Sequence, residues 1–157
     1  DIEAFSHVLT ASEIVKSYDF IAHLRPTNPF RKLSWWQDVV QKTKTDLNFT
    51  SIRSIEPATE NPYKMWKLDQ HGQIENVIKK SHISNHHSAP RQILPKVFKQ
   101  NAHLDILRKQ TILDGEILGQ NPLGLLVESG LPDIDTMQDL DLARVKFRNF
   151  IDPLLIK

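Results

Sequence analysis

A short apolar run that leads into a helix through two acidic residues constrains the fold of this chain most strongly. Residues 123–127 predict a buried strand, and apolar side chains recur at helical spacing from Leu140 to Phe150. Between these two elements stands Asp133-Ile134-Asp135-Thr136. Acidic residues at such a junction lie at the carboxyl edge of a sheet, where open α/β folds bind their ligands, and carboxylates suit a hard divalent cation. The junction is therefore compatible with an α/β fold in which Asp133 and Asp135 hold a metal ion.

The same junction has a second interpretation. Thr136 is followed three positions later by Asp139, which resembles a capping box with Asp in the usual place of Glu. Acidic residues in the first turn also suit the positive end of the helix dipole. In this interpretation the acidic residues start a helix and bind no metal, and the spacing alone leaves both interpretations open.

Strands and helices alternate along the rest of the chain. The residue pattern predicts strands at 20–24, 48–55 and 102–107, helices at 5–15 and 34–44, and a capping box at Ser34 and Gln37. The turn Asp69-Gln70-His71-Gly72 predicts a hairpin within residues 63–78, and residues 79–90 form a polar loop. We therefore expect one α/β domain over 1–157, with a mainly parallel sheet, helices on both faces and a projecting excursion at about 57–95.

The charge and composition of the chain narrow the possible classes of function. The 157 residues carry 20 basic and 19 acidic side chains, a balance that predicts neither nucleic-acid binding nor attraction to an anionic membrane. No apolar run approaches the roughly 18 residues of a membrane span. Cysteine is absent, which excludes disulfides and thiolate metal sites and favours a cytoplasmic protein.

Three further segments can be read together with the acidic pair. They are Leu24–Arg31 (LRPTNPFR), Asn61–Trp66 (NPYKMW) and Ala89–Ala102 (APRQILPKVFKQNA). With Asp133–Leu140, their order and spacing resemble the cytidylyltransferases that activate sialic acid and related nine-carbon sugars, the CMP-N-acylneuraminate synthetases. The resemblance extends from about residue 19 to residue 144.

The resemblance implies a fold and a reaction. The family has a Rossmann-like α/β fold with a β excursion that helps to build a homodimer. Its members transfer CMP from CTP to the anomeric hydroxyl of a nonulosonic acid and release pyrophosphate, with Mg²⁺ as the cofactor. The segments of this chain are similar to a branch that serves surface-polysaccharide biosynthesis.

The resemblance also assigns roles to individual residues. Asp133 and Asp135 match the pair that binds Mg²⁺ and acts in catalysis, and Arg91 matches an arginine that pairs with a sugar carboxylate or a phosphate. The positions that match substrate-binding residues are Arg25, Pro26, Thr27, Asn28, Lys64, Gln92 and Asn101. The structural alternatives are a surface arginine for Arg91, a solvated hairpin residue for Lys64 and a turn residue for Asn101.

The chain also departs from the family pattern. Many members have Gln at the position of Arg25, and well-studied members have Gly at the position of Ala102. The family opens with a Gly-rich loop that holds the CTP phosphates, whereas the five glycines here form no such loop. The chain begins with Asp1 rather than Met, and from the family pattern and the size of a Rossmann-like unit we expect roughly 70 or more upstream residues that hold this loop and the first strands.

Three other interpretations stay open. In the first, the chain lacks the nucleotide loop and is a catalytically inactive fragment that acts as a sugar-binding module or dimerises through residues 63–78. Alternatively, Asp133 and Asp135 form the metal-binding motif of an Asp-x-Asp glycosyltransferase. Finally, His82, His86 and His87 form a metal site, although the surrounding Ser, Asn and Pro favour a solvated loop.

Overall fold

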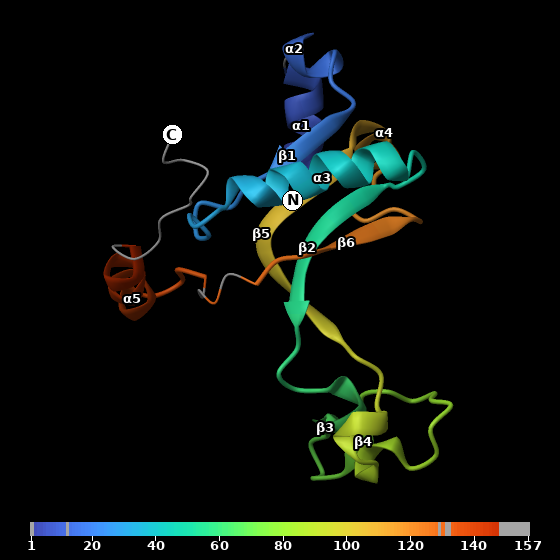
Figure 1. Cartoon of the computed structure of the whole chain (residues 1–157). Helices are drawn as coiled ribbons and strands as arrows, with labels where there is room; N and C mark the ends of the chain where they lie inside the picture. Colours follow the sequence, from blue (N-terminus) through green and yellow to red (C-terminus); the bar gives the residue numbers. More distant parts are fainter. Residues whose placement is uncertain (1, 12, 129, 131–132, 148–157) are drawn as a thin grey trace. The chain divides into compact units, whose positions relative to one another are not determined.

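The computed structural model describes residues 2–11, 13–128, 130 and 133–147. The chain consists of two compact units (Figure 1). The first unit is formed by the chain up to residue 55 and from residue 100 onward, and the second unit is residues 56–99. The predicted excursion at 57–95 falls within the range of the second unit.

The first unit is built on a sheet of four strands in the order β1-β5-β2-β6. Its strands are β1 (Phe20–His23), β2 (Ser51–Pro57), β5 (Phe98–Arg108) and β6 (Pro122–Leu126). β1 pairs with β5 antiparallel, and β2 pairs with β6 parallel. β5 and β2 run in opposite directions, as the backbone hydrogen bond of 3.1 Å from Arg108 N to Thr50 O at one end indicates (Figure 1).

The predicted α/β class is confirmed, but the described sheet is mostly antiparallel rather than mainly parallel. The difference comes from β5, which returns from residues 56–99 beside β2 and so runs against it. β1 then pairs with the other side of β5. β1, β2 and β6 consequently point the same way, and their carboxyl ends share one edge of the sheet.

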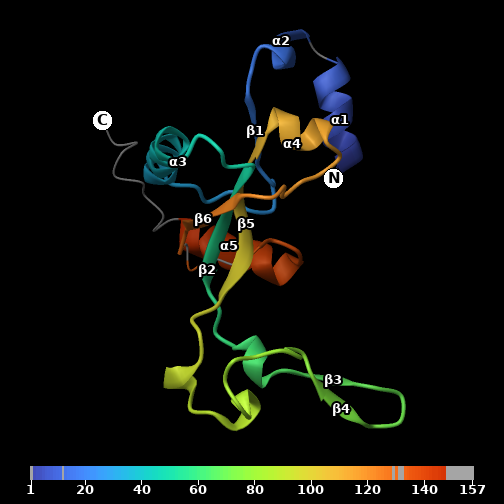
Figure 2. The ribbon, with the colours of Figure 1, turned by 90° about the vertical axis from the view of Figure 1, so that its right-hand side faces the viewer.

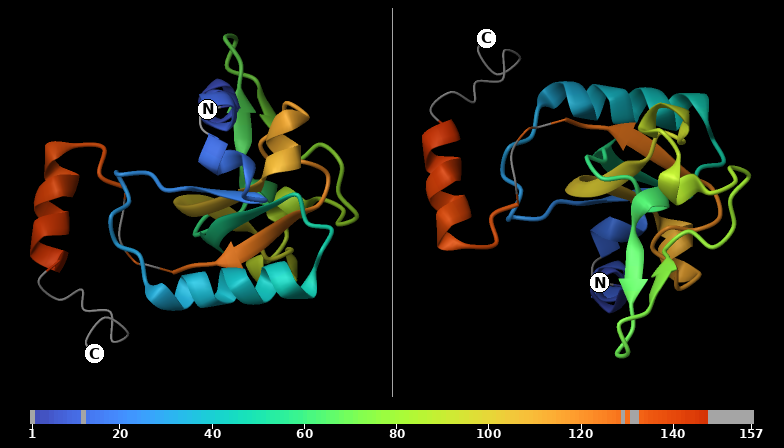
Figure 3. Two further views of the ribbon diagram at one scale, coloured as in Figure 1. Left: turned by 90° about the horizontal axis from the view of Figure 1, so that it is seen from above. Right: turned by 90° about the horizontal axis from the view of Figure 1, so that it is seen from below.

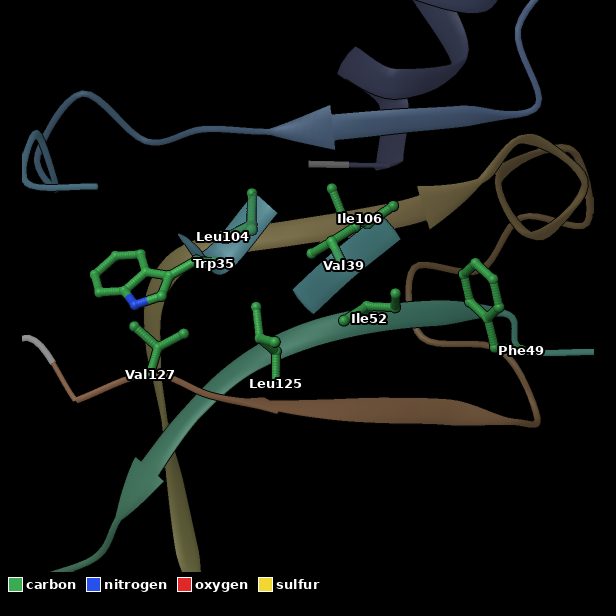
Figure 4. Packing of buried hydrophobic residues seen from close by; sticks show 8 residues of the cluster. All are labelled: Trp35, Val39, Phe49, Ile52, Leu104, Ile106, Leu125 and Val127. Atoms are coloured by element: carbon green, nitrogen blue, oxygen red, sulfur yellow. The ribbon is translucent and has the colours of Figure 1, made fainter. Parts of the chain in front are cut away.

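Helix α3 (Leu33–Thr45) covers one face of this sheet (Figure 2). Trp35 and Val39, four positions apart, lie on the same side of the helix and point into the main hydrophobic cluster. The buried members of this cluster come from the helix, from β2, β5 and β6, and from positions just before β2 and just after β6 (Figure 4): Trp35, Val39, Phe49, Ile52, Leu104, Ile106, Leu125 and Val127.

A smaller cluster lies on the opposite face of the sheet. Here α1 (Ile2–Ala11) packs against α4 (Lys109–Leu113). Phe5 and Leu9 of α1 meet Leu107 of β5, the neighbour in sequence of Ile106 in the first cluster. Successive strand residues point to opposite faces, so β5 supplies both clusters. The short helix α2 (Glu13–Lys16) follows α1.

The last described helix, α5 (Met137–Phe147), follows the acidic junction. Figure 3 shows α5 beyond the ends of two loops, the one after β1 and the one after β6. Ala143 is its buried residue. Phe150 of the predicted helical pattern lies outside the described residues.

The second unit contains a two-stranded hairpin of β3 (Trp66–Leu68) and β4 (Ile74–Asn76). The predicted hairpin turn is confirmed: the Asp69 carboxylate accepts hydrogen bonds of 2.8 Å from the backbone N–H groups of His71 and Gln73, and Gly72 has a φ of +80°. A left-handed residue at this point is easiest for glycine. Three short 3₁₀ turns complete the unit: η1 (Pro62–Lys64), η2 (His86–Ser88) and η3 (Arg91–Ile93).

One local prediction was wrong. The helix predicted at 34–44 is present, but Lys32 is its N-cap residue and makes no side-chain cap, so Ser34 and Gln37 form no capping box. Among the described residues, no helix is long and apolar enough to cross a membrane.

Candidate functional site at the carboxyl edge of the sheet

Three segments that are far apart in sequence meet at the carboxyl ends of β1 and β6. The side-chain amide of Asn28, in the loop after β1, donates to the carboxylate of Asp133 and, at 3.2 Å, to the backbone carbonyl of Asn101. Asn28 is only 1% exposed. Because one amide nitrogen joins residues separated by 73 and 105 positions, Asn28 is the centre of this cluster.

Two further hydrogen bonds hold the same segments together. The side-chain amide of Asn101, in β5, donates at 2.6 Å to the backbone carbonyl of Val127, which directly follows β6. The backbone N–H of Ile134 donates to the carbonyl of Thr27 at 2.9 Å. The first bond joins β5 to the segment after β6, and the second joins Ile134 to the loop after β1. The structure thus brings together Thr27, Asn28, Asn101 and Asp133 of the predicted site residues.

The donor set at this edge fits a hard cation. Asp133 is half-buried beside Asn28, and Asp135 is exposed two residues further on. The amide oxygen of Asn28 is buried and has no hydrogen-bond partner in the described chain, so one acceptor is left over at the cluster. Within the described residues, no three His, Asp or Glu side chains gather as metal ligands. A Mg²⁺ ion here would therefore need phosphate or water oxygens besides the protein carboxylates, as is usual for this ion.

The predicted capping box at the start of α5 is also present. Thr136 Oγ donates to Asp139 Oδ2 at 2.7 Å, the Thr136 N–H donates to the same oxygen at 2.9 Å, and Thr136 Oγ accepts from the Asp139 N–H. These hydrogen bonds from Thr136 lower the pKa of Asp139. The cap uses Asp139, so it leaves the carboxylates of Asp133 and Asp135 available.

Ala102 gives β5 an unusual backbone at the cluster. Its φ is +56°, in the left-handed region that side chains with a Cβ rarely adopt. Well-studied members of the family that the chain resembles have glycine at this position. The local distortion lies between Asn101, which faces the cluster, and the buried His103, so we infer that it sets the direction of the Asn101 side chain.

The loop after β1 is held by Arg31. Its Nε donates to the carbonyl of His103 at 2.7 Å, and its second guanidinium nitrogen donates to the carbonyl of Arg25 at 2.6 Å. Burial lowers the pKa of Arg31 from its ordinary value. Arg31 is thus a structural support, whereas Pro26 is an exposed residue of the loop that it holds.

The other predicted residues lie in the second unit. Arg91 is 68% exposed and forms an ion pair of 3.5 Å with the equally exposed Glu60. Gln92 is exposed, and the Lys64 ammonium lies 3.5 Å from the carbonyl of His87. These three residues belong to the second unit, whereas Asn28 belongs to the first.

The predicted histidine loop contains no three-ligand group among the described residues. His86 and His87 instead pack against aromatic rings. The His86 ring lies 5.4 Å from the Tyr63 ring, and the His87 ring lies 5.3 Å from the Trp66 ring.

Arg25 of the predicted site residues belongs to a charged cluster whose other members, Asp105 and Arg53, were not predicted from the sequence. Asp105 of β5 is 2% exposed and lies between Arg25, at 3.2 Å, and Arg53 of β2, at 3.3 Å. His23 lies close by, and burial followed by the charge of Arg25 lowers its pKa. The sequence did contain a signal for this cluster: Asp105 stands alone in an otherwise apolar run, Leu104-Asp105-Ile106-Leu107. A carboxylate buried with such a strand needs a charged partner, and this could have predicted an ion pair.

Asn28→Asp is expected to destabilise the fold at neutral pH by about 2 kcal/mol or more, because it removes a donor and places a second carboxylate beside Asp133. The repulsion raises the pKa of the new acid in the folded state. The destabilisation is therefore full above this raised pKa and fades as the pH falls below it. Urea unfolding at pH 7 and pH 4 measures the effect, with the exposed Asn121→Asp as control. Equal stability losses at both pH values would contradict the proposed contact.

The fold and the cluster define an α/β domain with a polar site at the shared carboxyl ends of its strands. No protein-family model and no curated protein sequence matches this chain.

Proposed function

We propose that this chain is part of a cytidylyltransferase that transfers CMP from CTP to an acylneuraminate-like nonulosonic acid in surface-polysaccharide biosynthesis. One observation carries the proposal. The positions that match three separate family motifs, Asn28, Asn101 and Asp133, form one hydrogen-bonded cluster. A chance likeness of short motifs gives no reason for these side chains to meet.

The fold is compatible with this proposal. Ligands of open α/β sheets bind outside the carboxyl ends of the strands. β1, β2 and β6 share one direction, and the cluster lies at their carboxyl ends. We extend the proposal to a Rossmann-like sheet that is mainly parallel in the whole domain, with β5 as its antiparallel member.

In the proposed reaction, the anomeric hydroxyl of the sugar acid attacks the α-phosphorus of CTP and pyrophosphate leaves. Asp133 and Asp135 would hold Mg²⁺, which neutralises charge on the phosphates when bound. Asn28 orients Asp133 through its amide, and Asn101 and the loop of Thr27 line the acceptor side. Such a site acts mainly through positioning and electrostatic stabilisation.

The test is release of pyrophosphate by the full-length protein with CTP, MgCl₂ and a panel of nonulosonic acids. We expect release that requires both CTP and one of the acids. Transfer of the sugar from a nucleotide-sugar donor to an acceptor glycan, with release of the nucleotide, would instead identify an Asp-x-Asp glycosyltransferase. If the protein shows neither activity, the inactive binding module is favoured.

We also propose that the hairpin of the second unit forms a homodimer interface. Three large apolar side chains are exposed on it: Trp66 at 43%, Leu68 at 71% and Ile74 at 59%. Exposed apolar groups gathered on one hairpin are typical of an interaction surface.

Leu68→Asp is expected to convert the dimer to a monomer, because the interface would have to bury an unpaired carboxylate. Light scattering after size-exclusion chromatography measures the mass. Ile14→Asp is the matched control, since Ile14 on α2 is also 71% exposed. A Leu68→Asp protein that stays dimeric, or a wild type that is monomeric, would exclude this interface.

A further inference from the structure

A cavity of about 290 Å³ lies on the α1 face of the sheet in the first unit. One part of its wall is polar and is formed by His23, Arg25, Arg53, Gln100 and Asp105. The rest is apolar and is formed by Phe5, Leu107, Ile117 and Leu118. A cavity with an apolar wall and a few converging polar groups is the usual form of a small-molecule site.

The polar wall is organised around the buried Asp105. Its carboxylate, 3% exposed, contacts Arg25 through one oxygen and Arg53 through the other. A second nitrogen of Arg53 donates to the side-chain oxygen of Gln100 at 3.1 Å. Each guanidinium has five N–H donors, and these contacts use only some of them. Both arginines are therefore fixed in position with donors to spare.

The charges of this wall are not balanced. Two guanidinium groups face one carboxylate, and both arginines are about three-quarters buried, at 26% and 25% exposed. His23 adds no charge when neutral, the form that its lowered pKa favours. One excess positive charge remains, and it is poorly screened in a partly buried site. Ion groups of this kind add little to stability compared with apolar packing, so a binding role is the better account of them.

We infer that Arg25 and Arg53 hold the carboxylate of a sugar acid in this cavity. A monovalent carboxylate neutralises the single excess charge, and its two oxygens match the geometry of a guanidinium. A phosphate dianion fits less well because Asp105 would repel its second charge. The identity of the acid rests on the proposed function, whereas the carboxylate site rests on the cavity. Arg91, exposed in the second unit, then does not hold the carboxylate.

The test measures binding of N-acetylneuraminate and of its methyl ester to the chain by NMR titration, without CTP. We expect the ester to bind at least about tenfold more weakly than the acid. Arg53→Met and Arg25→Met are expected to weaken acid binding about ten- to a hundredfold, and Arg53→Lys less, because it keeps the charge but loses the fork. Arg91→Met tests the alternative arginine, and Arg144→Met, at an exposed arginine paired with Asp141 in α5, is the control that is expected to bind as wild type.

Several results would overturn the inference. They are equal binding of acid and ester, loss of binding in Arg91→Met instead of the cavity variants, tighter binding of inorganic phosphate at Arg53, or no binding of the acid. The ester comparison uses the wild type, so the test survives if a cavity variant fails to fold. Pyrophosphate release is measured separately: acid binding without release would contradict only the proposed function.

Discussion

Asp135→Asn in the full-length protein is expected to lower CMP transfer by roughly a thousandfold while the fold stays intact. The carboxylate of Asp135 is exposed and takes no part in the helix cap, which uses Asp139. Its loss therefore removes a charge from the proposed Mg²⁺ site without breaking a structural contact. A metal ligand at a phosphoryl-transfer site stabilises charge in the transition state, so kcat falls most.

The matched control is Asp141→Asn, which removes another exposed carboxylate close by. Asp141 pairs with Arg144 within α5 at 3.0 Å and lies outside the cluster. Pyrophosphate release at saturating CTP and MgCl₂ measures both variants. Turnover of Asp135→Asn near that of the control would remove Asp135 from the metal site.

Phe49→Ala is expected to lower the free energy of unfolding by about 3–5 kcal/mol, the largest effect on stability that we predict. The Phe49 side chain is fully buried and stacks on Phe20 with 5.3 Å between ring centroids. The guanidinium of Arg108 lies 4.9 Å from the Phe49 ring and 5.1 Å from the Phe20 ring. Truncation leaves a cavity and removes one of the two rings against which this cation packs.

Thermal unfolding followed by circular dichroism measures this loss, with an expected decrease in Tm of about 10 °C for a chain of this size. Leu47→Ala is the control, because Leu47 is 73% exposed and should change stability by less than about 0.5 kcal/mol. Similar Tm values for the two variants would contradict the assigned core.

The elements that the sequence predicted correctly are those set by local patterns. The hairpin turn follows from Asp69 and Gly72, which supply an acceptor for free N–H groups and a left-handed residue. Helix α5 and its cap follow from Thr136 and Asp139. Each of these signals lies within five residues, so no knowledge of the tertiary fold was needed.

The direction of β5 could not be read locally. A strand pattern is the same for parallel and antiparallel pairing, and alternation with helices favoured a parallel sheet. The course of residues 56–99, which returns the chain beside β2, decides the direction. The capping box predicted at Ser34 was also wrong. Helix α3 begins at Leu33, so Ser34 lies inside its first turn and cannot be its N-cap residue.

The candidate site was predictable only in part. Asn28, Asn101 and Asp133 were named from motifs, but their meeting depends on loops separated by up to 105 residues. No sequence motif marked Asp105 or Arg53, and the two residues meet only because their strands, β5 and β2, are neighbours in the sheet. The carboxylate site therefore required the structure.

The most direct test of the central claim is to locate the metal ion by NMR. We would add MnCl₂ with CTP to the ¹⁵N-labelled full-length protein and follow the side-chain amide signals of Asn28 and Asn101. Because the Asn28 amide contacts Asp133, the account predicts strong paramagnetic broadening of both signals, lost in the Asp133→Asn, Asp135→Asn double variant. Sharp Asn28 and Asn101 signals, with broadening elsewhere or nowhere, would contradict a metal-dependent transfer site at this edge of the sheet.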